Sequence, residues 1–270
     1  MTDVGVPFGL GRRSHLAGLG WRGVQIVVPP VAAAGLLLAA WELASIYGLA
    51  NPRLVPAPSK VYATFVRSLD VLLEQAQPTL WGALAGIVIA AFTGILLGAA
   101  ISYSRTLMQA IYPTVVFFQL IPKVALAPVF LLWFGTGLSA NVIFSVFIAF
   151  FPVVVATIAG FRAMPASYEG LCRSLMMSKP RMFATVKFPF ALPHIFSGLR
   201  IGVTFAVIGV VLGEFITAQT GLGYIILFSA NNFETALLLA AILLLCGVGI
   251  VLFAFFLALE AIVMRLYDSR

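Results

Sequence analysis

Two charged side chains interrupt long apolar stretches of the sequence, and they are the first candidates for chemistry. Lys123 follows Pro122 in the apolar run 107–134, and Glu214 lies in the run 198–218. A charge inside a membrane span is costly and is a functional candidate by default. Each residue lies about 16 positions into its run, which at about 1.5 Å per residue gives a similar depth. We therefore predict that the two side chains approach each other or both face a central pathway.

Three roles stay open for this pair: a buried ion pair that fixes helix register, direct contact with a solute, or a gate. Gln119, Thr204 and Thr217 are weaker candidates for a translocation pathway, because threonine in a membrane helix commonly bonds to its own backbone. Three roles also stay open for the connection 218–232: a surface for a binding protein, part of an outer gate, or an ordinary connection between spans. Neither the two histidines nor the two cysteines show metal-ligand or catalytic spacing, so we expect no metal site and no enzyme.

The elements that must position these residues are membrane helices. Hydrophobic residues make up 62% of the 270 residues and charged residues 9%, against roughly 25% charged in soluble domains. A span needs about 20 largely apolar residues and crosses lipid as a helix. The sequence therefore predicts an all-α, polytopic membrane bundle of six spans, the first of them retained and not cleaved as a signal. The spans are predicted at 24–47, 79–102, 107–134, 140–161, 198–218 and 235–263.

Lysine and arginine residues set the orientation of such a bundle, because they gather on the cytoplasmic side. With the N-terminus inside, twelve fall inside and three outside, so both termini are predicted to be cytoplasmic. The net charge of +7 has the same origin and does not indicate nucleic acid. Residues 1–23 form a cytoplasmic tail and residues 24–270 a six-span domain. The inside residues are Arg12, Arg13, Arg22, Arg105, Arg162, Arg173, Lys179, Arg181, Lys187, Arg200, Arg265 and Arg270, and the outside ones Arg53, Lys60 and Arg67.

The one long charged connection, residues 163–198, is predicted to be a cytoplasmic helix–turn–helix. Ser167 can cap a first helix and Ser178 a second one. The turn falls at 176–178, and the second helix is expected to stop before Pro189. Apolar residues recur along both helices at helical spacing. They face a partner protein or the headgroups of the membrane.

This loop resembles the EAA loop of the permease subunits of bacterial ABC importers. That pattern runs E-A-A, three residues, G, about nine residues, then an apolar residue, any residue, an apolar residue and Pro. Residues 186–189 (Val-Lys-Phe-Pro) fit the ending. In that register the E-A-A positions hold Gly170, Leu171 and Cys172, and the glycine position holds Met176. Glu169 is one residue out of register.

Further stretches carry the likeness, which is most specific to permeases for nitrate, taurine and alkanesulfonates. They are residues 41–42, 55–58, 122–128, 133–135, 213–215 and 221–224. The third-span and fifth-span stretches resemble the vitamin-precursor and aromatic-ligand members slightly more. The resemblance implies a type I ABC importer-like fold. It also implies that the chain translocates a small solute of the sulfonate, nitrate, aromatic-acid or vitamin-precursor class.

The same resemblance implies the partners: a second permease in a homodimer or heterodimer, two ABC ATPase subunits, an extracytoplasmic binding protein and the lipid of a bacterial inner membrane. The chain has no G-x-x-x-x-G-K-[ST] loop, so ATP and Mg²⁺ belong to the ATPase and no cofactor is expected here. A self-sufficient channel or ion-coupled secondary carrier is the alternative function. The residues implied in ATPase coupling are Glu169, Gly170, Leu171, Cys172, Leu175, Met176, Met177, Ser178, Lys179, Arg181 and Phe183.

Overall fold

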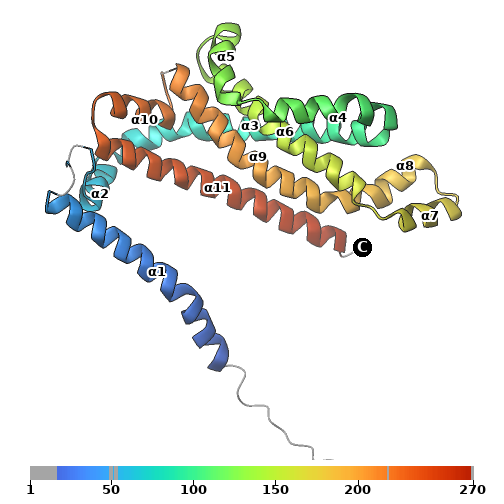
Figure 1. Cartoon of the computed structure of the whole chain (residues 1–270), viewed down its shortest axis with the longest axis horizontal. Helices are drawn as coiled ribbons and strands as arrows, with labels where there is room; N and C mark the ends of the chain where they lie inside the picture. The colour runs from blue at the N-terminus through green and yellow to red at the C-terminus, as the bar shows by residue number, and fades with distance from the viewer. Residues whose placement is uncertain (1–16, 49–50, 52–53, 218, 269–270) are drawn as a thin grey trace, which may run out of the picture. The chain divides into compact units, whose positions relative to one another are not determined.

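The structure, a computed structural model, describes residues 17–48, 51, 54–217 and 219–268 of the chain (Figure 1). For residues 17–27, Thr217 and Asp268 it describes the backbone alone. The chain divides into two compact units, Met1–Lys60 and Val61–Arg270, and each is considered by itself. All regular structure in the described part is helical, as expected where backbone groups must be satisfied in lipid.

The first unit contains helix α1 (Ala17–Ile46). Its segment Val28–Ile46 is long and apolar enough to cross a membrane. Residues 17–23, which belong to the predicted tail, are already helical. The remainder of the tail, residues 1–16, lies outside the described residues.

Helix α2 (Pro58–Arg67) begins one residue before Ser59. Ser59 donates its backbone N–H and its hydroxyl to the two carboxyl oxygens of Glu42, at 3.0 and 2.6 Å. A carboxyl group near the first turn of a helix satisfies N–H groups that have no partner within the helix. The start of α2 is therefore capped from α1.

Three long apolar helices form the core of the second unit and run side by side in Figure 1: α3 (Leu69–Tyr103), α6 (Leu138–Arg162) and α9 (Phe188–Thr217). Helix α11 (Thr235–Asp268) packs along α9. Glycines on α3 permit the close approach. A Cβ atom at Gly94 would lie 3.0 Å from Val153 Cγ1, and one at Gly98 would lie 2.7 Å from Thr157 Cβ. Gly94 and Gly98, four positions apart, thus place one face of α3 tightly against α6.

The third predicted span is not one straight helix. Helix α4 (Arg105–Leu120) is followed by a bend of 87° into η1 (Lys123–Leu126) and α5 (Ala127–Phe134). Proline lacks an N–H and disfavours helical conformation in the residue before it, and Ile121, before Pro122, is extended. Among the described residues, five helices are long and apolar enough to span a membrane. With the bent pair counted as one span, the total agrees with the six predicted spans.

The connection between α6 and α9 is a helical hairpin, as predicted, made of α7 (Ala166–Ser174) and α8 (Lys179–Met182). The prediction that its second helix stops before Pro189 is wrong. A π-helical turn, η2 (Phe183–Lys187), joins α8 to α9, and the N–H of Phe188 donates to the carbonyl oxygen of Phe183. This wider i→i+5 pattern accommodates a missing proline N–H, so one apolar helix runs over Lys179–Ile216.

Candidate functional site

The turn of the hairpin holds a methionine in a conformation that glycine usually takes. At the end of α7, Met177 N–H donates to Cys172 O at 3.0 Å and Met176 N–H donates to Arg173 O at 2.9 Å. This is the Schellman arrangement, whose C′ residue is left-handed. Met176 has φ of +50° and its side chain is 94% exposed. It stands at the position that the EAA register assigns to glycine, the residue that adopts this conformation most readily.

An exposed apolar strip leads along α7 to this tip. Tyr168, Leu171 and Leu175 are all exposed, and the spacing of four residues places the two leucines on one face of the helix. A contiguous apolar face in water is typical of a protein contact. Of the predicted coupling residues, Gly170, Ser178, Lys179 and Arg181 are also exposed, whereas Glu169, Met177 and Phe183 are half-buried. Cys172 is buried, so it packs within the hairpin and is not presented to a partner.

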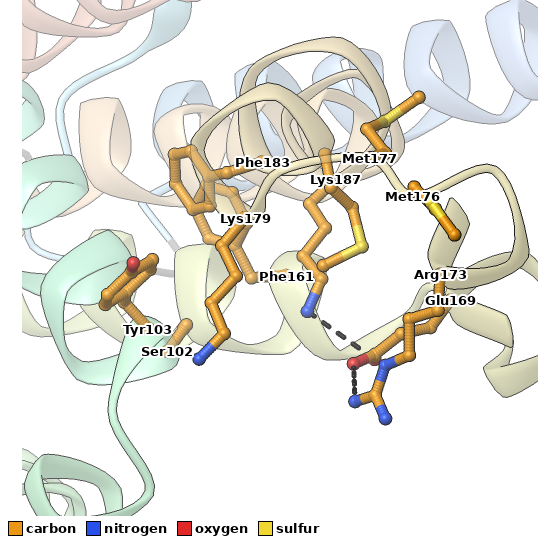
Figure 2. Close-up of a pocket in the computed structure, with 11 residues that line it drawn as sticks. Ser102, Tyr103, Phe161, Glu169, Arg173, Met176, Met177, Lys179, Phe183 and Lys187 are labelled. Atoms are coloured by element: carbon orange, nitrogen blue, oxygen red, sulfur yellow. Dashed lines mark hydrogen bonds and ion pairs between the residues drawn. The ribbon is translucent and has the colours of Figure 1, made fainter.

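The inner side of the hairpin borders a hollow of about 520 Å³, drawn in Figure 2. Glu169 lies between two cations there: Arg173 Nη2 at 2.8 Å and Lys187 Nζ at 3.6 Å. The hydrogen bond from Arg173 and the charge of Lys187 hold the pKa of the Glu169 carboxyl below its ordinary value. The phenyl rings of Phe161 and Phe183 stack across the wall with centroids 4.9 Å apart. The ion pair of Glu169 with Lys187 ties α7 to η2, and the ring stack ties η2 to the end of α6.

At the opposite end of the second unit, Glu214 holds a short helix in place. This helix, α10 (Leu222–Asn231), lies in the connection between α9 and α11. Glu214 is 1% exposed. Its Oε1 accepts the Thr79 hydroxyl at 2.7 Å and its Oε2 accepts the Gly223 N–H at 2.8 Å.

Side chains of α3 complete this attachment. The Thr79 hydroxyl oxygen also accepts the Leu222 N–H at 2.9 Å, and Gln75 Oε1 accepts the Gly221 N–H at 2.7 Å. The N–H groups at the start of α10, which have no partner within that helix, are thus taken by side chains from α3 and α9. We name Gln75, Thr79 and Glu214 the α10 clamp.

Two glycines leave the room that this clamp needs. Gly221 has φ of +104°, and a Cβ atom there would collide with the Glu214 carboxyl group. A Cβ atom at Gly223 would lie 2.8 Å from Glu214 Oε2. The stretches 213–215 and 221–224, singled out in the sequence as separate motifs, are therefore two halves of one contact.

The predicted approach of Lys123 to Glu214 is wrong. Lys123 Nζ donates to the carbonyl oxygen of Gln119 at 3.0 Å and lies 5.4 Å from the ring centroid of Phe151, a cation–π geometry. In the part of the chain that the structure describes, Lys123 forms no ion pair. The bend before Lys123 redirects the chain, so equal depth along two runs did not bring the two side chains together.

The remaining pathway candidates are not gathered into one site. The side chains of Gln119 and Thr204 are exposed on α4 and α9, and the side chain of Thr217 lies outside the described residues. Thr79 and Gln75 were missed by the sequence analysis, because a lone threonine or glutamine near a span end carries no spacing signal. The glycine pair at 221 and 223 was the available sign that something packs closely there.

Residues 64–267 match the family of binding-protein-dependent transport system inner membrane components. The chain belongs to this family. It is a membrane-spanning permease subunit of an ABC importer, as the loop at 163–198 led us to expect. Relatives named as nitrate, aliphatic sulfonate and taurine permeases are among those it matches.

Three similarities illustrate the relationship. The chain is 34% identical over 230 residues to the formylaminopyrimidine transport permease protein of Halalkalibacterium halodurans, covering 85% of this chain and 92% of that protein. It is 31% identical over 232 residues to the riboflavin transport system permease protein of Chloroflexus aurantiacus, covering 85% and 87%. Its fold is similar to a chain of the MetNI methionine ABC transporter in an inward-facing conformation, with a TM-score of 0.63, 17% identity and coverage of 74% and 97%.

Proposed function

We propose that the hairpin α7–α8 of this permease is the surface on which an ABC ATPase subunit docks, and that it passes the movement of the ATPase to the core helices. The single observation that carries this is the exposed apolar strip of Leu171, Leu175 and Met176. A helical face of this kind fits a groove on a partner protein. Only residues 163–165 separate the hairpin from α6, and η2 joins it to α9 without a break, so a displacement of the tip is transmitted to both.

The orientation proposed from lysine and arginine places this hairpin in the cytoplasm, together with both termini. ATP and Mg²⁺ would be held by the ATPase, because this chain lacks the phosphate-binding loop. Two permeases, identical or different, would form the pathway, with one ATPase on each hairpin. The bilayer is the inner membrane of a bacterium.

The end that carries α10 is then the outer one, and an extracytoplasmic binding protein delivers the solute there. The two relatives described above are named for formylaminopyrimidine and riboflavin. We take a nitrogen heteroaromatic vitamin or vitamin precursor as the substrate class, ahead of sulfonates, nitrate and aromatic acids. A thermal-shift screen of the partner binding protein tests this choice, and stabilisation by a sulfonate but by no heteroaromatic compound would contradict it.

Cysteine cross-linking tests the docking surface. Met176→Cys is made in a Cys246→Ala background, since Cys246 is exposed and Cys172 is buried. The control is Phe233→Cys at the other end of the second unit. Met176 and Phe233 are both exposed and both have positive φ, +50° and +58°. The two substitutions therefore place a cysteine in a similar backbone conformation and with similar access to solvent.

With the ATPase co-expressed, we expect a bifunctional maleimide to join Met176→Cys to the ATPase and to leave Phe233→Cys unlinked. Nucleotide should change the yield at Met176→Cys, because the docked subunits move during turnover. Equal yields at the two positions, or a cross-link at Phe233→Cys alone, would show that the ATPase docks elsewhere.

A further inference from the structure

The hollow behind the hairpin has the composition of a site for an anion with an apolar part. It is bounded by the ends of α3 and α6 and by the hairpin (Figure 2). The polar residues that line it are Ser102, Tyr103, Glu169, Arg173, Lys179 and Lys187, and the apolar ones are Phe161, Met176, Met177, Met182 and Phe183.

The charges of the lining are not balanced. Three cations and one carboxyl group face the hollow, which leaves a net charge of +2. Glu169 is already engaged by Arg173 and Lys187. Among the described residues, none forms a hydrogen bond or ion pair with the ammonium group of Lys179. In Figure 2 its ammonium group extends toward Ser102 and Tyr103. Lys179 therefore offers an uncompensated cation beside two hydroxyl groups, a combination suited to a phosphate group.

The rest of the wall is apolar and firmly packed. Phe183 stacks on Phe161 at 4.9 Å and meets Tyr103 edge-on at 6.3 Å, and Met182 in the same lining is buried. A soluble anion would gain nothing from these surfaces, whereas a lipid places glycerol and the first acyl carbons beside its phosphate. Polar and apolar walls within one hollow thus favour an amphiphile.

The position of the hollow makes such a lipid available. The apolar helices α3 and α6 end at Tyr103 and Arg162, so the hollow lies where these spans leave the hydrocarbon. Two further arginines lie at these helix ends, Arg105 at the start of α4 and Arg162 at the end of α6. Basic pockets between helices on the cytoplasmic side hold anionic headgroups.

We propose that the hollow formed by Ser102, Tyr103, Lys179 and Lys187 binds the phosphate of an anionic phospholipid of the adjoining leaflet. The lipid links the hairpin to the end of α3, with its phosphate on Lys179 and its glycerol against Phe183. This inference goes beyond the proposed function and does not depend on where the ATPase docks.

The full-length permease, in nanodiscs of mixed phosphatidylglycerol and phosphatidylcholine, is used to test this. After release into detergent, native mass spectrometry measures the ratio of the two lipids that stay bound. Lys179→Gln should lower the retained ratio about fivefold, from the attraction of one lysine near an anionic surface. Glu169→Gln, which removes the one anion of the lining, should raise it, and misfolding would not produce a rise. Arg181→Gln is the matched control, because Arg181 lies on the same helix but does not line the hollow.

Five outcomes would overturn the proposal. Lys179→Gln retains phosphatidylglycerol like the wild type, Arg181→Gln loses it to the same extent, or Glu169→Gln fails to raise it. The fourth is loss of ATPase co-purification in Lys179→Gln with lipid retention unchanged, which would assign the hollow to the subunit interface. The fifth is displacement of the retained lipid by inorganic phosphate in the wild type but not in Lys179→Gln. That result would show that the hollow binds a soluble phosphate compound and not a lipid.

Discussion

Removal of one hydroxyl group from the α10 clamp should destabilise the protein far more than the same change elsewhere on α3. Thr79 is fully buried, and its hydroxyl donates to Glu214 and accepts the Leu222 N–H. Valine has the same shape but leaves one buried carboxyl oxygen and one buried N–H without a partner. Two lost hydrogen bonds at about 0.5–1.5 kcal/mol each, together with the penalty for unsatisfied buried groups, give about 2–4 kcal/mol for Thr79→Val.

Thr93→Val is the matched control, since Thr93 lies on the same helix and donates only to the carbonyl oxygen of Ile89 within that helix, at 2.7 Å on the exposed face. It should change stability by about 0.5 kcal/mol or less. Reversible unfolding of the purified permease in bicelles, driven by sodium dodecyl sulfate and followed by circular dichroism, measures both. Equal unfolding midpoints for the two variants would refute the assignment of Thr79 to a structural clamp.

Three further predictions concern single positions. Gly221→Ala should lower the free energy of unfolding by about 2 kcal/mol or more, because residue 221 has positive φ and its Cβ atom would meet a buried carboxyl group. Gly170→Ala, with open space around its Cβ, should raise the free energy of unfolding by about 0.5–1 kcal/mol in the same assay. Met176→Gly should relieve the left-handed strain at the hairpin tip by about 1 kcal/mol, seen as slower proteolysis at the turn. Arg173 and Lys187 lower the pKa of Glu169, so the stabilisation of the hairpin by these ion pairs should be complete above pH 4.5 and lost as the pH falls through the lowered pKa. A spin label on the hairpin should become more mobile over that range.

The membrane spans could be predicted from the sequence because each is a long apolar run, and length with composition decides that question. The hairpin was equally accessible, since its turn falls between two short helices at the predicted place. The continuation of the second helix past Pro189 could not be predicted from the sequence. It depends on a π-helical turn at 183–187, and no residue type marks such a turn in a single sequence.

The partner of Glu214 could not be found from depth alone. Counting residues along a span gives its position across the membrane but not the face of the helix on which a side chain lies. Lys123 has similar depth in a straight third span, yet the bend at Pro122 removes it from Glu214. The true partners lie on α3 and in α10, a helix of 10 residues that is too short for a search for spans to detect.

The rate of ATP hydrolysis recovered with the tagged permease is the most direct test of the claim that the hairpin receives the ATPase. Leu175→Glu places a charge in the exposed strip, and Leu54→Glu places one on an exposed leucine on the predicted outer side; the two leucines are 66% and 57% exposed. If the strip is the docking surface, Leu175→Glu should lower the hydrolysis rate per permease about tenfold or more, the effect of losing a central interface residue. Leu54→Glu should leave it at the wild-type value. A Leu175→Glu complex that hydrolyses ATP as fast as the Leu54→Glu complex would contradict the account.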